Sequence, residues 1–270
     1  MTLGKPTLLV FTNLDGTLLD DAYDHEDTNQ TISQLQSMNI AIIFCSSKTQ
    51  GEIEFYRERM SIDSPFIAEN GGSIVIPKNY FPFVPPPSRS NNQYDIFDLG
   101  VPYPIVREKL SKIKLDTGAG IIGFGDLTVD EIAAETGLSV ELAKLAKNRE
   151  YDEPCRLLWG NEKEVAAAVE KEGLSFLRGS RYFHLWGGTN KGKAASLLKD
   201  LCFKAFGKMV SFGIGDSPVD LPMLGVVDVP LLVRKAAGGK NAHIVAWRNL
   251  LTLVAEKSQI EEEPISLRGQ

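Results

Sequence analysis

The chain has few cysteines and no long apolar run, and each absence excludes a class of protein. Its 270 residues include only Cys45, Cys155 and Cys202, which lie far apart in the sequence. An odd number without close spacing fits neither a disulfide framework nor a zinc site. No segment approaches the roughly 20 apolar residues that span a bilayer. We therefore expect a reduced, cytoplasmic protein with no membrane partner.

The sequence also lacks an excess of basic residues. Lysine and arginine number 29 against 35 aspartates and glutamates, which gives a formal net charge of -6. A general nucleic-acid binder needs a basic face because its partner is polyanionic. We therefore expect no nucleic-acid partner, and any anionic ligand must be held by a local group of cations.

Short apolar runs alternate with helical patterns at both ends of the chain. Strands buried on both faces are predicted at residues 7–11, 40–45, 65–68, 209–214 and 229–233. Helical apolar spacing covers 49–60 and 190–206. Such strands are typical of a parallel sheet that helices cover on both sides. Residues 1–85 and 187–270 are therefore predicted to form one α/β, doubly wound core domain.

The middle of the chain has a different pattern. A proline-rich stretch over 82–93 is typical of a surface linker, and mixed strand and helix patterns follow it. Helices are predicted to start at Thr128, which has capping-box spacing to Glu131, and at Ser139. Residues 86–186 are therefore predicted to form an α+β domain inserted into the core.

Polar groups follow the predicted core strands at the edge where parallel sheets bind ligands. They are Asn13 and Asp15 after the first strand, Ser46, Ser47 and Lys48 after the second, Lys191 in the first turn of the helix near 190, and Asp216 and Asp220 in GIGDSPVD (213–220). Each residue alone is better explained as a turn, cap or surface residue. Their coincidence at four successive places favours a functional site.

The residue types at this edge indicate phosphoryl transfer. Oxygen ligands at Asn13 and Asp216, with a backbone carbonyl near Asp15, suit Mg²⁺. Ser46 and Lys191 are suited to holding phosphate oxygens. A carboxylate at position 13 would attack phosphorus in line, and Asp15 would protonate the leaving group and then activate water.

These segments carry a family resemblance. FTNLDGTLL (11–19), Ser46, Lys191 and GIGDSPVD (213–220), in that order, resemble the four motifs of the haloacid dehalogenase (HAD) superfamily of phosphatases. The insert resembles that family's type 2 (C2) cap. The resemblance implies a Rossmann-like core, Mg²⁺ as cofactor and an aspartyl-phosphate intermediate. It implies catalytic roles at Asn13, Asp15, Ser46 and Lys191 and metal binding at Asn13, Asp15, Asp216 and Asp220, with Asp216 as direct ligand and Asp220 as its orienting partner.

Further segments resemble the mannosyl-3-phosphoglycerate phosphatase family. They are FCSSKT (44–49), FIAENGG (66–72), GFGDLT (123–128), TGLS (136–139), REYDEP (149–154) and RGSRYFHLWG (178–187). The resemblance implies hydrolysis of mannosyl-3-phosphoglycerate to phosphate and mannosylglycerate, a compatible solute. A glucosyl-3-phosphoglycerate substrate, a broader sugar-phosphate phosphatase and a phosphomutase are the alternatives.

Such a substrate carries a phosphate, a carboxylate and a sugar, so the cap must supply a cation and polar groups. Arg181 suits the carboxylate because a guanidinium binds it through two hydrogen bonds. His184 is explained equally well as a packed core histidine. The other candidate substrate-binding residues are Ser47, Lys48, Glu69, Asn70, Gly71, Gly72, Asp126, Thr128 and Arg149. Helix capping explains Thr128 equally well, and the end of a helix explains Arg149.

Two positions depart from the family pattern. Family members carry aspartate where Asn13 stands, and an amide is a poor nucleophile that brings no negative charge. We therefore predict little or no turnover with substrate binding retained. The other catalytic and metal positions are intact, which favours a deliberate disarming substitution over a natural pseudophosphatase that binds a phosphorylated metabolite. The second departure is Val219, where asparagine commonly precedes the second aspartate of the fourth motif.

Overall fold

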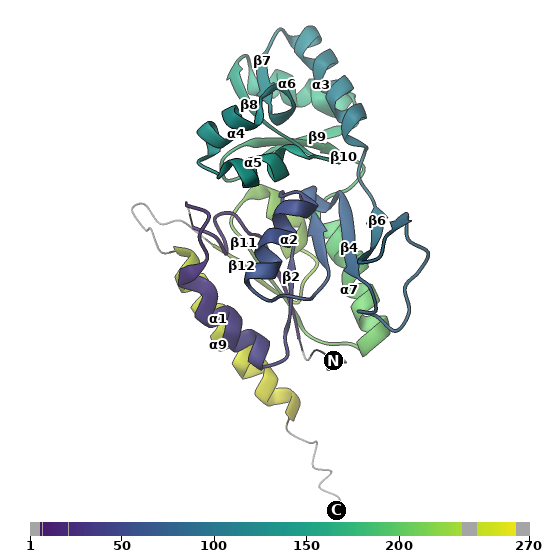
Figure 1. Ribbon diagram of the computed structural model, residues 1–270, viewed down its shortest axis with the longest axis vertical. Coiled ribbons are helices and arrows are strands. Elements are labelled where there is room, and N and C mark those ends of the chain that lie inside the picture. The colour runs from purple at the N-terminus through teal and green to yellow at the C-terminus, as the bar shows by residue number, and fades with distance from the viewer. Residues whose placement is uncertain (1–5, 7, 21, 234–241, 263–270) are drawn as a thin grey trace, which may run out of the picture.

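The computed structural model describes residues 6, 8–20, 22–233 and 242–262, which form a core and a cap (Figure 1). The core contains a parallel sheet in the order β12-β11-β1-β2. Its strands are β1 (Leu9–Thr12), β2 (Ala41–Phe44), β11 (Ser211–Gly215) and β12 (Val229–Leu232). One parallel bridge, Cys45 to Ile67, continues it toward β3 (Phe66–Ala68). Because the chain moves outward from β1 on both sides, this order confirms the predicted doubly wound core.

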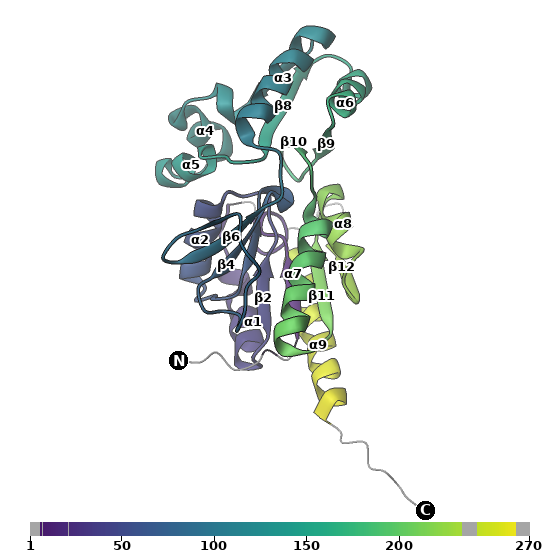
Figure 2. The ribbon, with the colours of Figure 1, turned by 90° about the vertical axis from the view of Figure 1, so that its right-hand side faces the viewer.

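Alternation along β1 builds a hydrophobic layer on each face of this sheet. Leu8 and Val10 belong to one buried cluster, and Leu9 and Phe11 belong to the other. The first cluster includes residues of α1 (Glu26–Ser37), α2 (Gln50–Arg59) and α9 (Ala242–Glu262). The second includes residues of α7 (Lys191–Phe206) and α8 (Leu221–Leu224) (Figure 2). Side chains that alternate between faces thus need helices on both sides.

An antiparallel sheet in the order β3-β4-β6-β5 extends the core and corrects the predicted domain boundary. β4 (Ser73–Pro77) pairs with β6 (Tyr94–Asp98), and β5 (Arg89–Ser90) pairs with β6. The backbone groups of residues 89–98 are therefore satisfied by the core rather than by the cap. The predicted start of the cap at residue 86 is too early, and the chain enters the cap only after Asp98.

The cap is an antiparallel sheet with two pairs of helices. Its strand order is β7-β8-β10-β9, built from β7 (Gly120–Gly123), β8 (Glu153–Trp159), β9 (Leu174–Arg178) and β10 (Phe183–Gly187). One hydrophobic cluster joins this sheet to α3 (Tyr103–Thr117) and α6 (Glu162–Lys171). A second cluster lies between α4 (Val129–Thr136) and α5 (Val140–Lys147). The predicted helix caps at Thr128 and Ser139 are both present, and the α+β cap is confirmed.

Two adjacent segments connect the cap to the core (Figure 2). The N–H groups of Leu99 and Gly100 donate to the carbonyl of Gly72, and the N–H of Val101 donates to the carbonyl of Gly187. The outgoing and returning segments are thus tied to each other and to the core. Among the helices of the described residues, none is long and apolar enough to cross a membrane.

Candidate active site

Asn13 lies directly after β1, at the carboxyl edge of the parallel sheet. Its N–H donates to the carbonyl of Ile214, which fixes the end of β1 beside β11. The chain then turns at Gly16, which has φ of +73°, and a Cβ there would lie 2.6 Å from Asp216 Oδ2. Only glycine combines this backbone conformation with so close an approach. The turn therefore brings the segment of Asn13 and Asp15 against the carboxylate of Asp216.

The side chain of Asn13 bridges three groups of the site. Its Nδ2 lies 2.9 Å from the carbonyl oxygen of Asp15 and 2.9 Å from Asp216 Oδ1. Lys191 Nζ donates to its Oδ1 over 3.1 Å. An ammonium group only donates, whereas a carbonyl and a carboxylate only accept, so these partners determine which way the amide faces.

Lys191 and Asp220 form a buried ion pair beneath this edge. Their side chains are 2% and 0% exposed, and Nζ lies 2.6 Å from Asp220 Oδ1. Asp220 Oδ2 accepts hydrogen bonds from the N–H groups of Asp216 and Ser217 and from the Ser217 hydroxyl. Burial lowers the pKa of Lys191, but the Asp220 carboxylate together with Cys45 and Asp216 outweighs burial, and the pKa is raised. Asp220 thus holds the lysine charged and shapes the loop that carries Asp216.

The oxygen donors near Asn13 fit a hard divalent cation. Burial, reinforced by the charge of Asp220, raises the pKa of Asp216. A cation would offset this penalty by pairing with the carboxylate. The described residues contain no cluster of three or more His, Cys, Asp or Glu side chains suited to a metal. The donor set here is instead mixed: position 13, the Asp15 carbonyl and Asp216. The Asn13 Nδ2 donates to the Asp15 carbonyl oxygen and to Asp216 Oδ1. An aspartate at position 13 would instead place a third oxygen beside these two.

Lys48 holds the carboxylate of Asp15. Its Nζ lies 3.0 Å from Asp15 Oδ1 and 3.3 Å from Glu52 Oε1, and 4.8 Å from the ring centre of Tyr23. Burial lowers the pKa of Lys48, but Asp15 and Glu52 outweigh it and the pKa is raised. The candidate acid therefore lies beside a permanently charged lysine.

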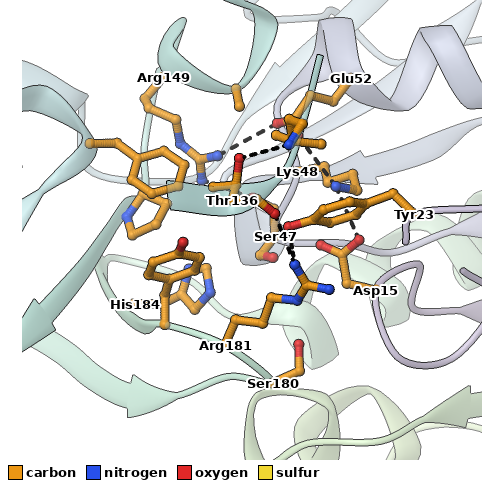
Figure 3. A pocket seen from close by; sticks show the side chains of 15 residues that line it. Asp15, Tyr23, Ser47, Lys48, Glu52, Thr136, Arg149, Ser180, Arg181 and His184 are labelled. Carbon is orange, nitrogen blue, oxygen red and sulfur yellow. Dashed lines mark hydrogen bonds and ion pairs between the residues drawn. The ribbon is translucent and has the colours of Figure 1, made fainter. Parts of the chain in front are cut away.

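Two adjoining cavities lie where the cap meets the core, and Figure 3 shows the larger one. They share Asp15, Ser47, Ser180 and His184. The smaller cavity is also lined by Asn13, Asn70, Gly179, Lys191, Ser217 and Val219. The larger is also lined by cations and aromatic rings, among them Tyr23, Lys48, Phe124, Arg149, Arg181 and Tyr182. A phosphate ester in the smaller cavity would therefore place the rest of its molecule in the larger one.

Arg181 and His184 reach this boundary from the cap. Arg181 Nη1 donates to the Tyr23 hydroxyl over 2.8 Å and to the Thr136 carbonyl over 3.2 Å, and its guanidinium lies 4.3 Å from the Tyr23 ring centre. Strict strand alternation would separate Arg181 from His184. Both nevertheless line the larger cavity, because Arg181 precedes β10 and its backbone does not follow the strand. Sequence reasoning missed Tyr23, since a lone aromatic residue in a loop carries no recognisable signal.

Glu69 and Arg149, both candidate substrate ligands, tie the cap to the core. The Glu69 carboxylate accepts hydrogen bonds from the N–H groups of Glu150, Tyr151 and Asp152 over 2.8 to 3.1 Å. Arg149 donates to the carbonyls of Ser47 and Asp152 and to the Asp152 carboxylate. Burial raises the pKa of Glu69 to about 7, against the opposing effects of Arg149 and the N–H donors. These contacts make both residues part of the domain interface.

The structure does not bring Asp126 and Thr128 to either cavity. Asp126 forms ion pairs with Arg107 and Lys114 within the cap. The Thr128 hydroxyl pairs with Glu131 in the capping box of α4. Capping and local charge pairing account for both, so their predicted contacts with the substrate have no support in this geometry.

Three more candidates lie in the packed walls around the site. Ser46 is fully buried, and its Oγ accepts the N–H of Lys48, whereas Ser47 lines both cavities. Gly71 has φ of +95°, and a Cβ there would lie 2.4 Å from the Asn190 carbonyl oxygen. A Cβ on Gly72 would lie 2.5 Å from Tyr151. The two glycines are thus explained by close packing of the core against α7 and the cap.

Comparison with known proteins agrees with this geometry. The family model of the haloacid dehalogenase-like hydrolases matches residues 10–83. A glucosyl-3-phosphoglycerate/mannosyl-3-phosphoglycerate phosphatase of Methanococcoides burtonii is 40% identical, over 88% of each chain. A mannosyl-3-phosphoglycerate phosphatase of Pyrococcus horikoshii is 38% identical, over 91% of this chain and 98% of the relative. The chain belongs to the haloacid dehalogenase-like hydrolases, among their phosphatases.

Solved structures support the same fold. A HAD subclass IIB sugar phosphatase superposes with a TM-score of 0.59 at 15% identity, covering 93% of this chain and 98% of that chain. A haloacid dehalogenase-like hydrolase from B. subtilis gives a TM-score of 0.59 at 15% identity, covering 90% and 98%. The predicted Rossmann-like core with an inserted cap is therefore confirmed at the level of fold.

Proposed function

We propose that this chain has the active site of a mannosyl-3-phosphoglycerate phosphatase whose nucleophile position is occupied by Asn13. The observation that carries the proposal is the convergence of Asn13, Asp15, Lys191 and Asp216 at one edge of the parallel sheet. The names of the two relatives describe phosphatases of the same substrate class, which supports the proposal.

The reaction proposed for an Asn13→Asp chain has two steps. A carboxylate oxygen at position 13 attacks phosphorus, and the bond to the glycerate oxygen breaks as Asp15 gives that oxygen a proton. Asp15 then takes a proton from water, which attacks phosphorus and releases phosphate from position 13. Lys191, held by Asp220, offsets charge on the attacked group. Mg²⁺ held by position 13, the Asp15 carbonyl and Asp216 would supply further positive charge to the phosphoryl oxygens.

The two cavities divide the proposed substrate into two parts. The phosphate occupies the smaller cavity, beside Asn13 and Lys191. The sugar and glycerate extend toward the larger one, whose volume of about 50 Å³ has to grow by movement of the cap to admit them. There Arg181 offers charge to a carboxylate and Tyr182 offers an aromatic face. Because an amide replaces the carboxylate at position 13, the chain as it stands binds this substrate and does not turn it over.

The test is phosphate release with Mg²⁺ from mannosyl-3-phosphoglycerate, glucosyl-3-phosphoglycerate and hexose phosphates. The Asn13→Asp chain is expected to exceed the unsubstituted chain by at least about 10³-fold, a typical cost of losing a nucleophile. Preference for the glucosyl compound would select that alternative, and comparable rates on hexose phosphates would select a broader phosphatase. Release from none of them by folded Asn13→Asp protein, with binding retained, would contradict the proposal and favour a pseudophosphatase.

A further inference from the structure

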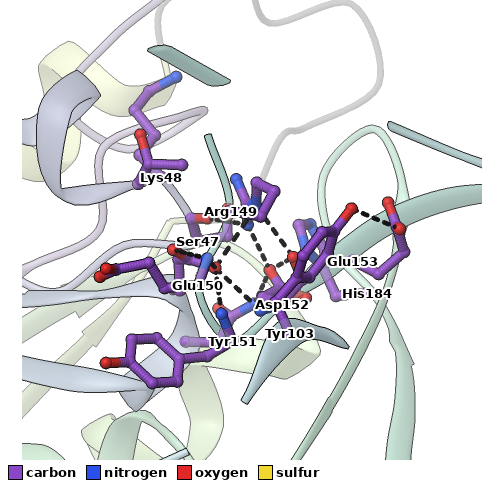
Figure 4. A network of polar contacts seen from close by, with 12 residues as sticks. Ser47, Lys48, Tyr103, Arg149, Glu150, Tyr151, Asp152, Glu153 and His184 are labelled. Carbon is purple, nitrogen blue, oxygen red and sulfur yellow. Dashed lines mark hydrogen bonds and ion pairs between the residues drawn. The ribbon is translucent and has the colours of Figure 1, made fainter. Parts of the chain in front are cut away.

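Asp152 is a buried carboxylate on which three side chains converge. It lies in the cap loop just before β8 and is 0% exposed (Figure 4). Its Oδ2 lies 2.7 Å from His184 Nδ1, 2.9 Å from Arg149 Nη2 and 3.0 Å from Asn70 Nδ2. A buried carboxylate is stable only with such donors, so the position of each partner depends on the others.

Both domains set the position of this carboxylate. His184 and Arg149 belong to the cap, whereas Asn70 belongs to the core segment after β3. The N–H of Asp152 also donates to Glu69 Oε2 over 2.8 Å, which is a second contact with the core. Asp152 therefore makes all of these contacts only when the cap rests on the core.

The pairing determines which nitrogen of His184 faces the cavities. A carboxylate accepts hydrogen bonds, so Nδ1 must carry a proton, and whenever the ring is uncharged Nε2 is left as an acceptor. A Cβ on Gly179 would lie 3.0 Å from Nε2, so this nitrogen lies at the segment of Gly179 and Ser180. That segment lines the smaller cavity, and His184 lines both.

We propose that Asp152 is a positioning residue that fixes the ring of His184, so that Nε2 accepts a hydrogen bond from a substrate hydroxyl where the two cavities meet. The inference rests on the proposed function, because it takes the ligand to be a hydroxyl-bearing phosphate ester. It also couples recognition to cap docking, since the core residues Asn70 and Glu69 help to hold Asp152.

A double-mutant cycle in the unsubstituted chain tests this role without turnover. The measurement is the Kd for mannosyl-3-phosphoglycerate by calorimetry, with Asp152→Asn, His184→Asn and the double variant. The His184→Asn side chain retains a donor near the position of Nδ1 but loses Nε2. Each single change is expected to weaken binding roughly 3- to 10-fold, the effect of one hydrogen bond. The double variant should bind about as weakly as either single one, because Asp152 acts through His184.

The control is Asp95→Asn, the same chemical change at a core carboxylate that pairs with Lys78 away from both cavities. It should leave the Kd unchanged. If the effects of Asp152→Asn and His184→Asn multiply, Asp152 acts through other contacts and the inference is overturned. Unchanged binding by His184→Asn would overturn it as well.

A second measurement needs no substrate and separates this inference from the proposed function. The chain contains only three histidines, His25, His184 and His243, so their ring nitrogens can be assigned in a long-range ¹H–¹⁵N spectrum. The proton of the neutral His184 ring is expected on Nδ1, and the Asp152→Asn change should alter the signals of His184 alone. A proton on Nε2 would overturn the inference even if the Asn13→Asp chain is an active phosphatase. If that chain is inactive, the same spectrum still decides whether Asp152 orients the ring.

Discussion

The core and the cap supply their parts of the site in different ways. Core groups follow parallel strands whose ends meet at one edge, so backbone pairing brings Asn13 and Asp216 together. The cap sheet is antiparallel and has no such common edge. Two of its contributions, Asp152 and Arg181, come from loops beside strands, and a third, His184, comes from the strand β10. The difference teaches that the core site follows from topology, whereas the cap site depends on contacts with the core.

The largest expected effect concerns the buried ion pair that supports the core part of the site. Lys191→Met leaves Asp220 as a buried, uncompensated charge and should lower the free energy of unfolding by about 3–5 kcal/mol. Urea unfolding measures it, and Lys193→Met, at an exposed position of the same helix, is the matched control. A cost below about 1 kcal/mol would show that this ion pair does not anchor the core site.

The next effect tests the interface through Glu69. Its pKa is about 7 in the folded chain against an ordinary value of 4.5, so the folded chain holds the proton more tightly. The stability that this proton contributes is present below about pH 4.5 and is lost as the pH rises to about 7. The shift corresponds to about 3 kcal/mol across that window. The Gln side chain of Glu69→Gln cannot titrate, so the variant does not lose this stability. The free energy of unfolding of the variant minus that of the unsubstituted chain should therefore rise by this amount between pH 4.5 and 7. A constant difference would contradict the account.

A slightly smaller effect concerns the metal site of the core. In the unsubstituted chain, Asp216 Oδ1 accepts a hydrogen bond from Asn13 Nδ2 over 2.9 Å. Asn13→Asp replaces this donor with a carboxylate oxygen. This variant should lose stability without Mg²⁺ and regain about 2.7 kcal/mol when Mg²⁺ is present at about 100 times its Kd. Thermal unfolding with and without Mg²⁺ measures it, and the unsubstituted chain should respond less. Equal responses would count against metal binding at position 13.

The smallest expected effect tests the contact between Tyr23 of the core and Arg181 of the cap. Tyr23→Phe removes the hydroxyl that accepts from Arg181 but keeps the ring, and should cost about 1 kcal/mol of substrate binding. In the Asn13→Asp background this appears as a KM raised about 5-fold with kcat little changed. Tyr103→Phe, whose hydroxyl pairs with Glu153 inside the cap, is the control. Equal KM values for both variants would mean that the contact between Tyr23 and Arg181 does not support binding.

Much of the core could be predicted from the sequence. The apolar runs of β1, β2 and β11 are continuous, as expected for strands of a parallel sheet. The polar residues that follow them must then meet at the carboxyl edge of that sheet. The sequence predicts Asp220 as the orienting partner of the metal ligand Asp216, and in the structure Asp220 Oδ2 accepts the N–H groups of Asp216 and Ser217.

The cap contacts could not be predicted in the same way. The sequence predicts Glu69 as a substrate ligand, because its partners are backbone N–H groups about 80 residues further along the chain and leave no signal near it. Asp126 is also predicted as a substrate ligand, but its carboxylate pairs with Arg107 and Lys114 on α3 and lines neither cavity. The early boundary at residue 86 arose because β6 carries no sign of which sheet it joins.

The most direct test of the central claim is to trap the covalent intermediate. The Asn13→Asp chain is mixed with mannosyl-3-phosphoglycerate and Mg²⁺, quenched in acid during turnover, and digested for mass spectrometry. The account predicts phosphate on the peptide that contains position 13, and none there in the unsubstituted chain. Phosphate on another residue, or steady release of phosphate with no trapped species at position 13, would contradict it.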